Sequence, residues 1–267
     1  MRPPVVLTIA GSDSGGGAGI QADLKTFAAL GLHGTSAITA VTAQNTLGVS
    51  GFVELAPDMV RAQIDDVVTD LAPAAAKTGM LASAAIIEVV AEAAAAHGLS
   101  RLVVDPVMVA KGGAKLLRDD AVEAMRARLL PLAAIVTPNL PEAEVLLDRG
   151  IATRDERERA AADLVGLGCR AAVVKGGHAG GDADDVLFAG GEPVWLCGER
   201  IATGNTHGSG CTFSAAIAAG LARGVDLERA VGDAKVFITG AIEEALEVGH
   251  GHGPVNPMWA VVPWRRG

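Results

Sequence analysis

Residues 205–212 (NTHGSGCT) place two glycines and a cysteine at the expected start of a long helix, 209–222. Gly208 and Gly210 carry no side chain, so backbone N–H groups at the helix N-terminus are open to a small anion such as phosphate. Cys211 lies in the first turn, where the helix dipole is expected to lower the pKa of its thiol and favour the thiolate. The stretch predicts an anion-binding loop with Cys211 as base or nucleophile. A small buried cysteine that packs the helix start is the alternative.

Polar residues or glycines also follow six predicted strands in turn. In open α/β sheets, ligands bind beyond the carboxyl ends of the strands. A polar loop is the simpler explanation for any one of these segments, but six in succession favour a site at that edge. The segments are 11–13, 42–45, 77–80, 105–106, 137–139 and 175–177.

The first of these segments opens a glycine-rich stretch, GSDSGGGAG at 11–19, between a strand and a helix. Gly17, Gly19 and Ala22 fit the dinucleotide pattern G-x-G-x-x-A, but the first of these glycines lies several residues past the strand. The chain has no P-loop motif. We expect a loop that lets the backbone approach a small ligand; a plain glycine-rich turn is the alternative.

Two charged residues fall on or beside apolar helix faces. Asp23 lies between Ile20 and Phe27 on the face of helix 18–30 that is expected to be buried. A buried carboxylate needs a partner, which is either a ligand, as we favour, or a structural cation or N–H group. Lys235 follows Val231 by four residues on the last helix, where it either extends its stem along the surface or reaches a nucleotide phosphate.

Short apolar runs alternate with helical stretches along almost the whole chain. The runs at 5–10, 36–41, 74–77, 102–104, 134–137 and 171–174 are continuously apolar, as parallel strands buried on both faces are. Expected helices include 57–71, 83–97, 119–129, 153–167, 209–222 and 226–248. This alternation indicates an α/β fold with a mostly parallel sheet and helices on both faces. Short antiparallel edge strands are expected at 186–189, 194–197 and 200–202.

Composition limits the class of protein. The chain of 267 residues is 50% hydrophobic, which suits one domain over 1–267, with 255–267 as an irregular tail and the nearby His250 and His252 in a mobile segment. Only 3% of residues are aromatic and the net charge is −9, so a nucleic-acid surface is not expected. The three cysteines lack metal-ligand spacing. No apolar run has the length of a signal peptide or a membrane span, so we expect a soluble cytoplasmic protein.

Seven segments occur in order between residues 5 and 253: AGSDSGGGAGIQAD at 10–23, TAVTAQNT at 39–46, KTGML at 77–81, DPVM at 105–108, TPNLPEAE at 137–144, VKGGH at 174–178 and NTHGSGCT at 205–212. Together they resemble the bacterial hydroxymethylpyrimidine/phosphomethylpyrimidine kinases of thiamine biosynthesis. The resemblance implies a ribokinase-like three-layer sandwich with its site at the carboxyl edge of the sheet. It also implies 4-amino-5-hydroxymethyl-2-methylpyrimidine and then its monophosphate as substrates, ATP with Mg²⁺ as phosphoryl donor, and a homodimer.

The resemblance also implies roles for individual residues. Gln44 matches the pyrimidine-binding glutamine, and the same pocket is matched by Gly11, Asp23, Met80 and Val107. The nucleotide side is matched by Asp105, Asn139, Lys175 and Lys235, and the metal region by Asp105 and Glu142. Cys211 stands where related sugar kinases have an aspartate base, in the loop formed with Gly208, Ser209 and Gly210.

Two departures and two alternatives accompany the resemblance. Ser209 replaces the usual threonine and keeps the hydroxyl group, whereas Gly204 replaces a common basic residue and removes any phosphate contact from that position. A pyridoxal kinase on the same scaffold is the nearest alternative. A non-catalytic vitamin or nucleotide sensor is the other, and the intact GSGC loop argues against it because binding alone needs no base.

Overall fold

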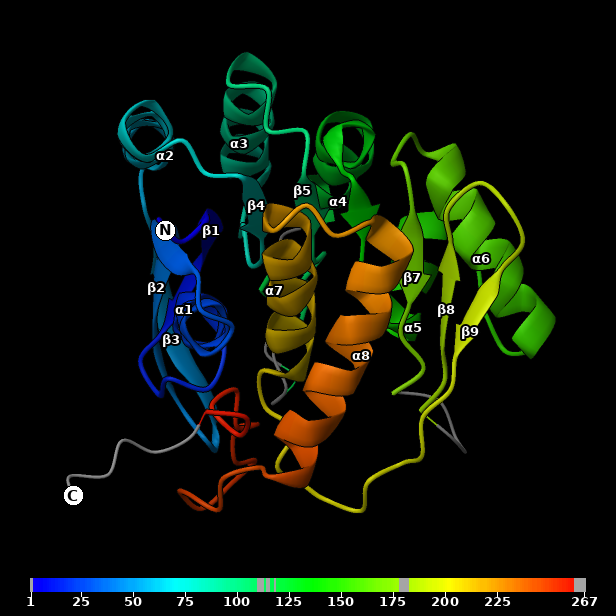
Figure 1. Cartoon of the computed structure of the whole chain (residues 1–267). Helices are drawn as coiled ribbons and strands as arrows, with labels where there is room; N and C mark the ends of the chain where they lie inside the picture. The colour runs from blue at the N-terminus through cyan, green and yellow to red at the C-terminus, as the bar shows by residue number, and fades with distance from the viewer. Residues whose placement is uncertain (1, 110–112, 114–115, 118, 178–182, 262–267) are drawn as a thin grey trace.

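The computed structural model describes residues 2–109, 113, 116–117, 119–177 and 183–261. They form three layers, with a central sheet between two sets of helices (Figure 1). This arrangement confirms the α/β fold class expected from the alternation of strands and helices.

The sheet has nine strands in the order β3-β2-β1-β4-β5-β6-β7-β8-β9. From β2 to β7 neighbouring strands are parallel, and β3, β8 and β9 are antiparallel additions at the two edges. The carboxyl ends of the parallel strands therefore meet at one edge of the sheet. The strands are β1 Val5–Asp13, β2 His33–Asn45, β3 Gly48–Glu54, β4 Ala75–Thr78, β5 Leu102–Val104, β6 Ile135–Val136, β7 Ala172–Val174, β8 Asp185–Phe188 and β9 Val194–Leu196.

Each face of the sheet carries its own apolar core. Along β5, Leu102 and Val104 point into one core and Val103 into the other, because successive strand residues face opposite sides. The first core packs under α2 Pro57–Leu71, α3 Ala84–Ala96, α4 Asp119–Ala124, α5 Leu140–Leu147 and α6 Arg154–Gly166. The second packs under α1 Gly19–Ala29, α7 Ser209–Ala222 and α8 Leu227–Glu243. Both cores consist largely of Ala, Val, Leu and Ile, as the low aromatic content requires.

Most predicted elements lie within a few residues of their expected bounds, and α2 and β5 match them. Three elements were not predicted: β3, which pairs antiparallel with β2, the short 3-10 helix Leu130–Leu132, and α5, which follows β6. The helix predicted at 119–129 divides into α4 and a π-helical turn, Met125–Leu129. The strand predicted at 200–202 is wrong, since these residues are irregular and Thr203 N–H bonds back to the Ile201 carbonyl.

The chain after α8 differs from the expectation in two ways. The helix predicted to reach residue 248 ends at Glu243, because Leu246 N–H bonds to the Pro254 carbonyl instead of continuing the helix. The segment that holds His250 and His252 is attached to β2, since the N–H groups of His250 and Gly251 donate to Thr46 Oγ1 and that of His252 donates to the Thr46 carbonyl. Residues 255–261 form turns and irregular structure, and residues 262–267 of the predicted tail lie outside the described residues.

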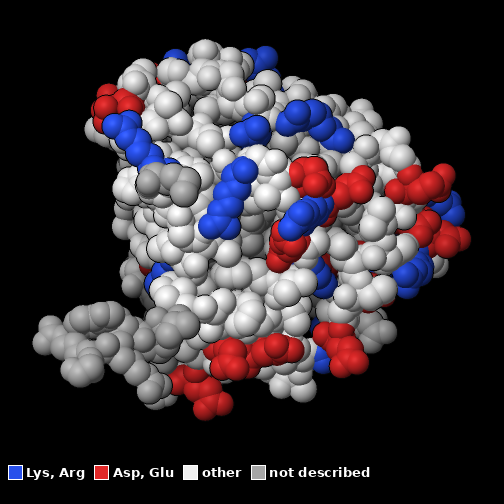
Figure 2. All heavy atoms as spheres, viewed as in Figure 1, with Lys and Arg blue, Asp and Glu red and all other residues white. Residues whose placement is uncertain are grey.

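Charged side chains are unevenly distributed over one face of the molecule (Figure 2). On the face covered by α1, α7 and α8, acidic side chains gather along the lower rim and basic ones are dispersed over the upper half (Figure 2). No continuous basic surface is visible among the described residues on this face. Within the described ranges, no helix has both the length and the apolar composition that a membrane crossing requires.

Candidate active site

The segment predicted to bind an anion lies at the N-terminus of α7. Gly208 is the N-cap residue, with φ of 78°, and no side chain among the described residues caps this helix. A Cβ on Gly208 would also lie 1.8 Å from the Gly17 carbonyl oxygen, so this position accepts only glycine. In the first turn the Ser209 N–H donates to the Thr206 carbonyl at 3.2 Å, whereas the N–H groups of Gly210 and Cys211 have no side-chain cap among the described residues and can face a ligand.

Below this turn lies a pair of opposite charges. A Cβ built on Gly210 would lie 3.3 Å from Lys175 Nζ and 3.6 Å from Asp105 Oδ2, which places both groups beside the loop. Lys175 Nζ donates to Asp105 Oδ1 at 3.1 Å, and Ser214 Oγ and Thr137 Oγ1 each donate to Asp105 at 3.2 Å. Burial opposes ionisation of Asp105, but Lys175 and Lys77 together with these hydrogen bonds hold its pKa below the usual range.

Asp23 is buried, as predicted, and its partner is a cation from another strand. Lys77 Nζ donates to both carboxylate oxygens of Asp23, at 3.0 and 3.1 Å, and Thr8 Oγ1 donates to Oδ2 at 2.6 Å. Neither Lys77 nor Asp23 has exposed side-chain surface. The structure thus shows the ion pair that we considered as the alternative, and the ligand contact predicted for Asp23 has no exposed atom to make it.

The thiol of Cys211 differs from the expectation. Burial raises its pKa to about 11, although Lys77 and the Gly19 N–H both act in the opposite direction. The expected lowering by the helix dipole is therefore wrong, because removal of the thiol from water outweighs it. The raised pKa favours the neutral thiol of Cys211 in the free protein.

Asn139 and Glu142 form a capping box at the start of α5. Asn139 Oδ1 accepts the Glu142 N–H at 2.9 Å, and Glu142 Oε2 accepts the Asn139 N–H at 2.8 Å. Burial raises the pKa of Glu142 to about 7. An isolated bridge joins Asn139 to Lys175, so the cap lies next to the Asp105–Lys175 pair.

This neighbourhood suits a divalent cation that is shared with a substrate. Mg²⁺ is usually held by one or two carboxylates together with phosphate oxygens and water. Asp105 and Glu142 supply such carboxylates. Burial acts to lower the pKa of Lys175, but the negative charges of both carboxylates raise it. No cluster of three or more His, Cys, Asp or Glu residues is found in the described ranges. The donor set therefore fits a cation that binds with a nucleotide.

Three of the predicted substrate residues form one apolar cluster. Met80, with Ala40, Ala82 and Leu116, makes a small buried group against which Val107 packs. The Met80 sulfur would lie 3.1 Å from a Cβ on Gly11. Gly11, Met80 and Val107 thus lie together near the ends of β1, β4 and β5, and their role in a substrate pocket stays a prediction.

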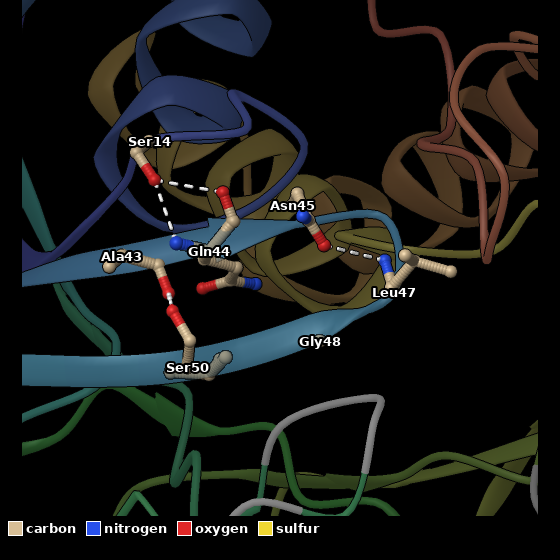
Figure 3. Close-up of a pocket in the computed structure, with 8 residues that line it drawn as sticks. Ser14, Ala43, Gln44, Asn45, Leu47, Gly48 and Ser50 are labelled. Carbon is tan, nitrogen blue, oxygen red and sulfur yellow. Dashed lines mark hydrogen bonds between the residues drawn. The ribbon is translucent and has the colours of Figure 1, made fainter.

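Gln44 lines a hollow at the tip of the β2–β3 hairpin. The hollow has a volume of about 520 Å³ and is bordered by Ser14, Ala43, Gln44, Asn45, Leu47, Gly48, Val49 and Ser50 (Figure 3). Ser14 Oγ donates to the Gln44 carbonyl and accepts the Gln44 N–H, both at 2.8 Å, which attaches the glycine-rich loop to β2. Of the predicted substrate residues, Gln44 alone is in this lining.

Lys235 occupies the other end of the site. Its Nζ donates to Asp185 Oδ2 at 2.8 Å and to the Ala183 carbonyl at 2.5 Å. Asp185 Oδ1 accepts the Gly176 N–H at 2.8 Å. Lys235 therefore supports the segment that follows Lys175.

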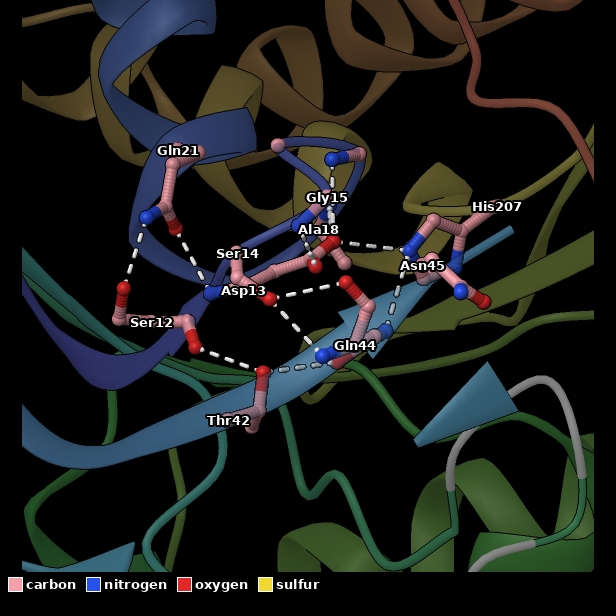
Figure 4. A network of polar contacts seen from close by, with 12 residues as sticks. Ser12, Asp13, Ser14, Gly15, Ala18, Gln21, Thr42, Gln44, Asn45 and His207 are labelled. Carbon is pink, nitrogen blue, oxygen red and sulfur yellow. Dashed lines mark hydrogen bonds and ion pairs between the residues drawn. The ribbon is translucent and has the colours of Figure 1, made fainter. Parts of the chain in front are cut away.

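Sequence reasoning gave no role to a network around Asp13 and His207. Asp13 accepts N–H groups from Gly15, Gly17 and Ala18, and it pairs with His207 Nε2 at 2.9 Å (Figure 4). The His207 nitrogen also lies 3.2 Å from Gln44 Nε2. An aspartate followed by several glycines, whose N–H groups are accessible, is the sequence feature that could have indicated it.

The nine-strand sheet, its two helical layers and the anion loop at the strand ends define a ribokinase-like fold. The sequence model of a family described as phosphomethylpyrimidine kinase matches residues 13–256. A hydroxymethylpyrimidine/phosphomethylpyrimidine kinase of Streptomyces coelicolor is 51% identical over 261 residues, covering 98% of this chain and 97% of that protein. The chain therefore belongs to the phosphomethylpyrimidine kinase family.

Solved structures agree with this assignment. The ADP complex of Bacillus subtilis pyridoxal kinase superposes with a TM-score of 0.89 at 40% identity, covering 96% of this chain and 97% of that one. A phosphomethylpyrimidine kinase of Clostridium difficile superposes with a TM-score of 0.80 at 43% identity, covering 90% and 99%. Proteins named for two different substrates thus share this fold.

Proposed function

We propose that this protein transfers the γ-phosphoryl group of ATP to 4-amino-5-hydroxymethyl-2-methylpyrimidine, and then phosphorylates the monophosphate to the diphosphate. The observation that carries the proposal is the uncapped N-terminus of α7 lying directly over the Asp105–Lys175 pair. N–H groups and an ammonium group at one point are suited to a transferring phosphoryl group. The family assignment supports the substrate.

The first reaction joins the hydroxymethyl oxygen to the γ-phosphorus while the bond from that phosphorus to the β,γ-bridging oxygen breaks and ADP leaves. The hydroxyl proton goes to Cys211 or to solvent. Phosphoryl transfer depends on positioning and charge stabilisation more than on a strong base. The N–H groups of Gly208, Gly210 and Cys211 stabilise the equatorial oxygens, and that of Ser209 joins them only by leaving the Thr206 carbonyl.

Cys211 acts as hydrogen-bond acceptor and base for the substrate hydroxyl. Because its pKa is raised, Cys211 must first lose its own proton to solvent, and the resulting thiolate accepts the hydroxyl proton as the new P–O bond forms. Lys77 and Lys175 lie near enough to favour the thiolate electrostatically. In the second reaction the acceptor is an ionised phosphate, so Cys211 has no proton to remove.

Asp105 and Glu142 would hold Mg²⁺ against the nucleotide phosphates, where the cation neutralises negative charge. Lys175 contributes its ammonium group beside Asp105, and Asn139 fixes Glu142 through the capping box. Lys235 supports the segment after Lys175 from α8. These residues make up the nucleotide side of the proposed site.

The pyrimidine occupies the space between Gln44 and the apolar cluster of Gly11, Met80 and Val107. Gln44 offers one donor and one acceptor group, which complement the ring nitrogen and amino group of an aminopyrimidine. Asp23 contributes indirectly by holding Lys77, since its own oxygens are occupied. A homodimer in the cytoplasm remains our expectation from the family.

Phosphorus NMR tests the proposal directly. The protein, ATP, Mg²⁺ and the hydroxymethylpyrimidine should yield ADP and the pyrimidine monophosphate, followed by the diphosphate. Asp105→Asn should reduce the rate by about 100-fold or more, because a buried charge beside the phosphoryl group is lost. The matched control, Asp66→Asn on the exposed face of α2, should leave the rate unchanged. Absence of phosphate transfer by the folded wild-type protein would refute the proposal.

Pyridoxal is the second candidate substrate. It is supported by the close superposition with Bacillus subtilis pyridoxal kinase. Pyridoxal also carries a hydroxymethyl group on an aromatic heterocycle, so the same transfer chemistry applies to it. The two candidates differ in the polar edge that they present to Gln44.

A further inference from the structure

Asp13 is surrounded by hydrogen-bond donors. Its Oδ1 accepts the Gly15 N–H at 2.8 Å, and its Oδ2 accepts the N–H groups of Gly17 at 3.0 Å and Ala18 at 2.8 Å. Burial would raise its pKa, but the hydrogen bonds from His207, Ala18 and Gly15 hold it below the usual range. Asp13 is therefore an ionised carboxylate that can only accept hydrogen bonds.

The ionised Asp13 carboxylate determines which ring nitrogen of His207 carries a hydrogen. Nε2 lies 2.9 Å from Asp13 Oδ2, and the His207 side chain is only 11% exposed. Two lone pairs facing each other at that distance would repel, so Nε2 must carry a hydrogen that Asp13 Oδ2 accepts. A second group close to Nε2 can share this one hydrogen only as an acceptor. The backbone holds the ring in place, because His207 N–H donates to the Gly253 carbonyl and the His207 carbonyl accepts the Val255 N–H.

The hydrogen on His207 then determines the orientation of the Gln44 amide. Gln44 Nε2 lies 3.2 Å from His207 Nε2, so in this orientation two donors face each other. Gln44 Oε1 lies 3.2 Å from Thr42 Oγ1, whose single hydrogen is already donated to the Ser12 carbonyl at 2.9 Å. A half-turn of the amide relieves both conflicts, because O and N exchange places without moving any other atom.

We infer that His207, fixed by Asp13, is a positioning residue that directs Gln44 Oε1 toward itself and Gln44 Nε2 toward Thr42, and so sets the donor and acceptor order of the substrate pocket. The network is visible in Figure 4, where Asp13, His207, Gln44, Thr42 and Ser12 form one continuous chain. Asp13 and His207 are 194 residues apart in sequence, and their contact ties the glycine-rich loop to the anion loop.

The donor and acceptor order of the Gln44 amide determines which substrate edge can form hydrogen bonds with it. Once His207 and Thr42 have each used one site of the amide, Gln44 keeps one lone pair on Oε1 and one hydrogen on Nε2. An aminopyrimidine presents an amino donor beside a ring-nitrogen acceptor, which matches that edge in one orientation only. The 4-oxo analogue, with a carbonyl beside a ring N–H, presents the reverse order and should be rejected. This expectation about substrate choice rests on the proposed pyrimidine kinase activity. The hydrogen-bond order from Asp13 through His207 to Gln44 does not depend on that activity.

Nitrogen-15 NMR of the wild-type protein tests the order without any substrate. His207 Nε2 should give a pyrrole-like shift with a directly bonded hydrogen, assigned by its loss in His207→Gln. A pyridine-like Nε2 would overturn the inference, since the ring would then accept from Gln44. A protein that shows the expected shift but phosphorylates no pyrimidine would contradict the proposed function and leave the order standing.

Substrate selectivity tests the consequence. The wild-type protein should prefer the 4-amino substrate over the 4-oxo analogue by about 100-fold or more in kcat/KM, because a wrong donor order leaves polar groups unpaired. In His207→Leu the Gln44 amide is free to turn, and this preference should fall below about tenfold. His207→Gln keeps an N–H donor and should retain most of the preference. The control is His97→Leu, which removes another His–Asp pair (2.6 Å to Asp65) far from Gln44 in sequence.

The selectivity ratio separates this role from a structural one. A variant that is merely less well folded loses activity toward both pyrimidines, so the ratio stays at the wild-type value. An unchanged ratio in His207→Leu would therefore overturn the positioning role. If His97→Leu also lost the preference for the 4-amino substrate, the positioning role would likewise be overturned. That result would show that selectivity does not depend on the network of Asp13, His207 and Gln44.

Discussion

Lys77 and Asp23 form an ion pair of 3.0 Å in which neither side chain has exposed surface. Removing one member leaves the other charge buried, so Lys77→Met should lower the free energy of unfolding by about 3–5 kcal/mol in urea denaturation. The double variant Lys77→Met/Asp23→Leu should recover much of this loss, because no charge remains to desolvate.

An exposed ion pair provides the control for this prediction. Arg229 and Asp233 lie 3.7 Å apart with side chains 73% and 66% exposed. Arg229→Met should change the free energy of unfolding by less than about 1 kcal/mol. Equal effects of Lys77→Met and Arg229→Met would show that the buried pair is unimportant for stability.

The backbone at Gly208 is a second testable feature. Gly208→Ala should destabilise the protein by at least about 1–2 kcal/mol, because alanine is disfavoured at φ of 78° and its Cβ would meet the Gly17 carbonyl. Phosphoryl transfer should be lost with it. Gly232, in α8, has no atom within 4 Å of an added Cβ, so Gly232→Ala should stabilise the protein by about 0.5–1 kcal/mol. Thermal and urea unfolding distinguish these outcomes; two variants of equal stability would contradict the role assigned to Gly208.

Alkylation of Cys211 tests its raised pKa. In a Cys169→Ser/Cys197→Ser background, iodoacetamide should react slowly at pH 7 and faster as pH rises toward about 11, since only the thiolate reacts. A variant that keeps the exposed Cys197 alone gives the rate of an accessible thiol for comparison. Rapid, pH-independent reaction of Cys211 near neutrality would mean that the helix dipole, not burial, controls this thiol.

The fold was largely predictable because the apolar runs of buried strands are continuous. β3 escaped prediction because its residues are mostly exposed and it contains two glycines, so its strand conformation depends on pairing with β2. The α5 helix could have been found, since Asn139 and Glu142 have the spacing of a capping box.

The site was less predictable for a different reason. Asp23 could be placed on a buried face, but nothing local indicates that its partner is Lys77, 54 residues away. His207 likewise depends on Asp13, which only the fold brings near. For Cys211 the helix N-terminus and burial act in opposite directions, and the sequence shows only the first.

The proposed base function predicts a difference between the two reactions. Cys211→Ala should slow phosphorylation of the hydroxymethyl group by about 10²–10⁴-fold, the usual contribution of a general base. The second phosphorylation should slow far less, since its acceptor is already ionised. Single-turnover rates with each acceptor measure this directly. Equal losses in both reactions would contradict the base assignment and point to a packing role for Cys211.

The most direct test of the central claim compares kcat/KM for the hydroxymethylpyrimidine and for pyridoxal with the same enzyme, ATP and Mg²⁺. A pocket whose polar edge is set by Gln44 should favour the aminopyrimidine by about 100-fold or more, because pyridoxal has no amino group beside its ring nitrogen. Equal or higher efficiency with pyridoxal would contradict the assignment of this protein as a pyrimidine kinase.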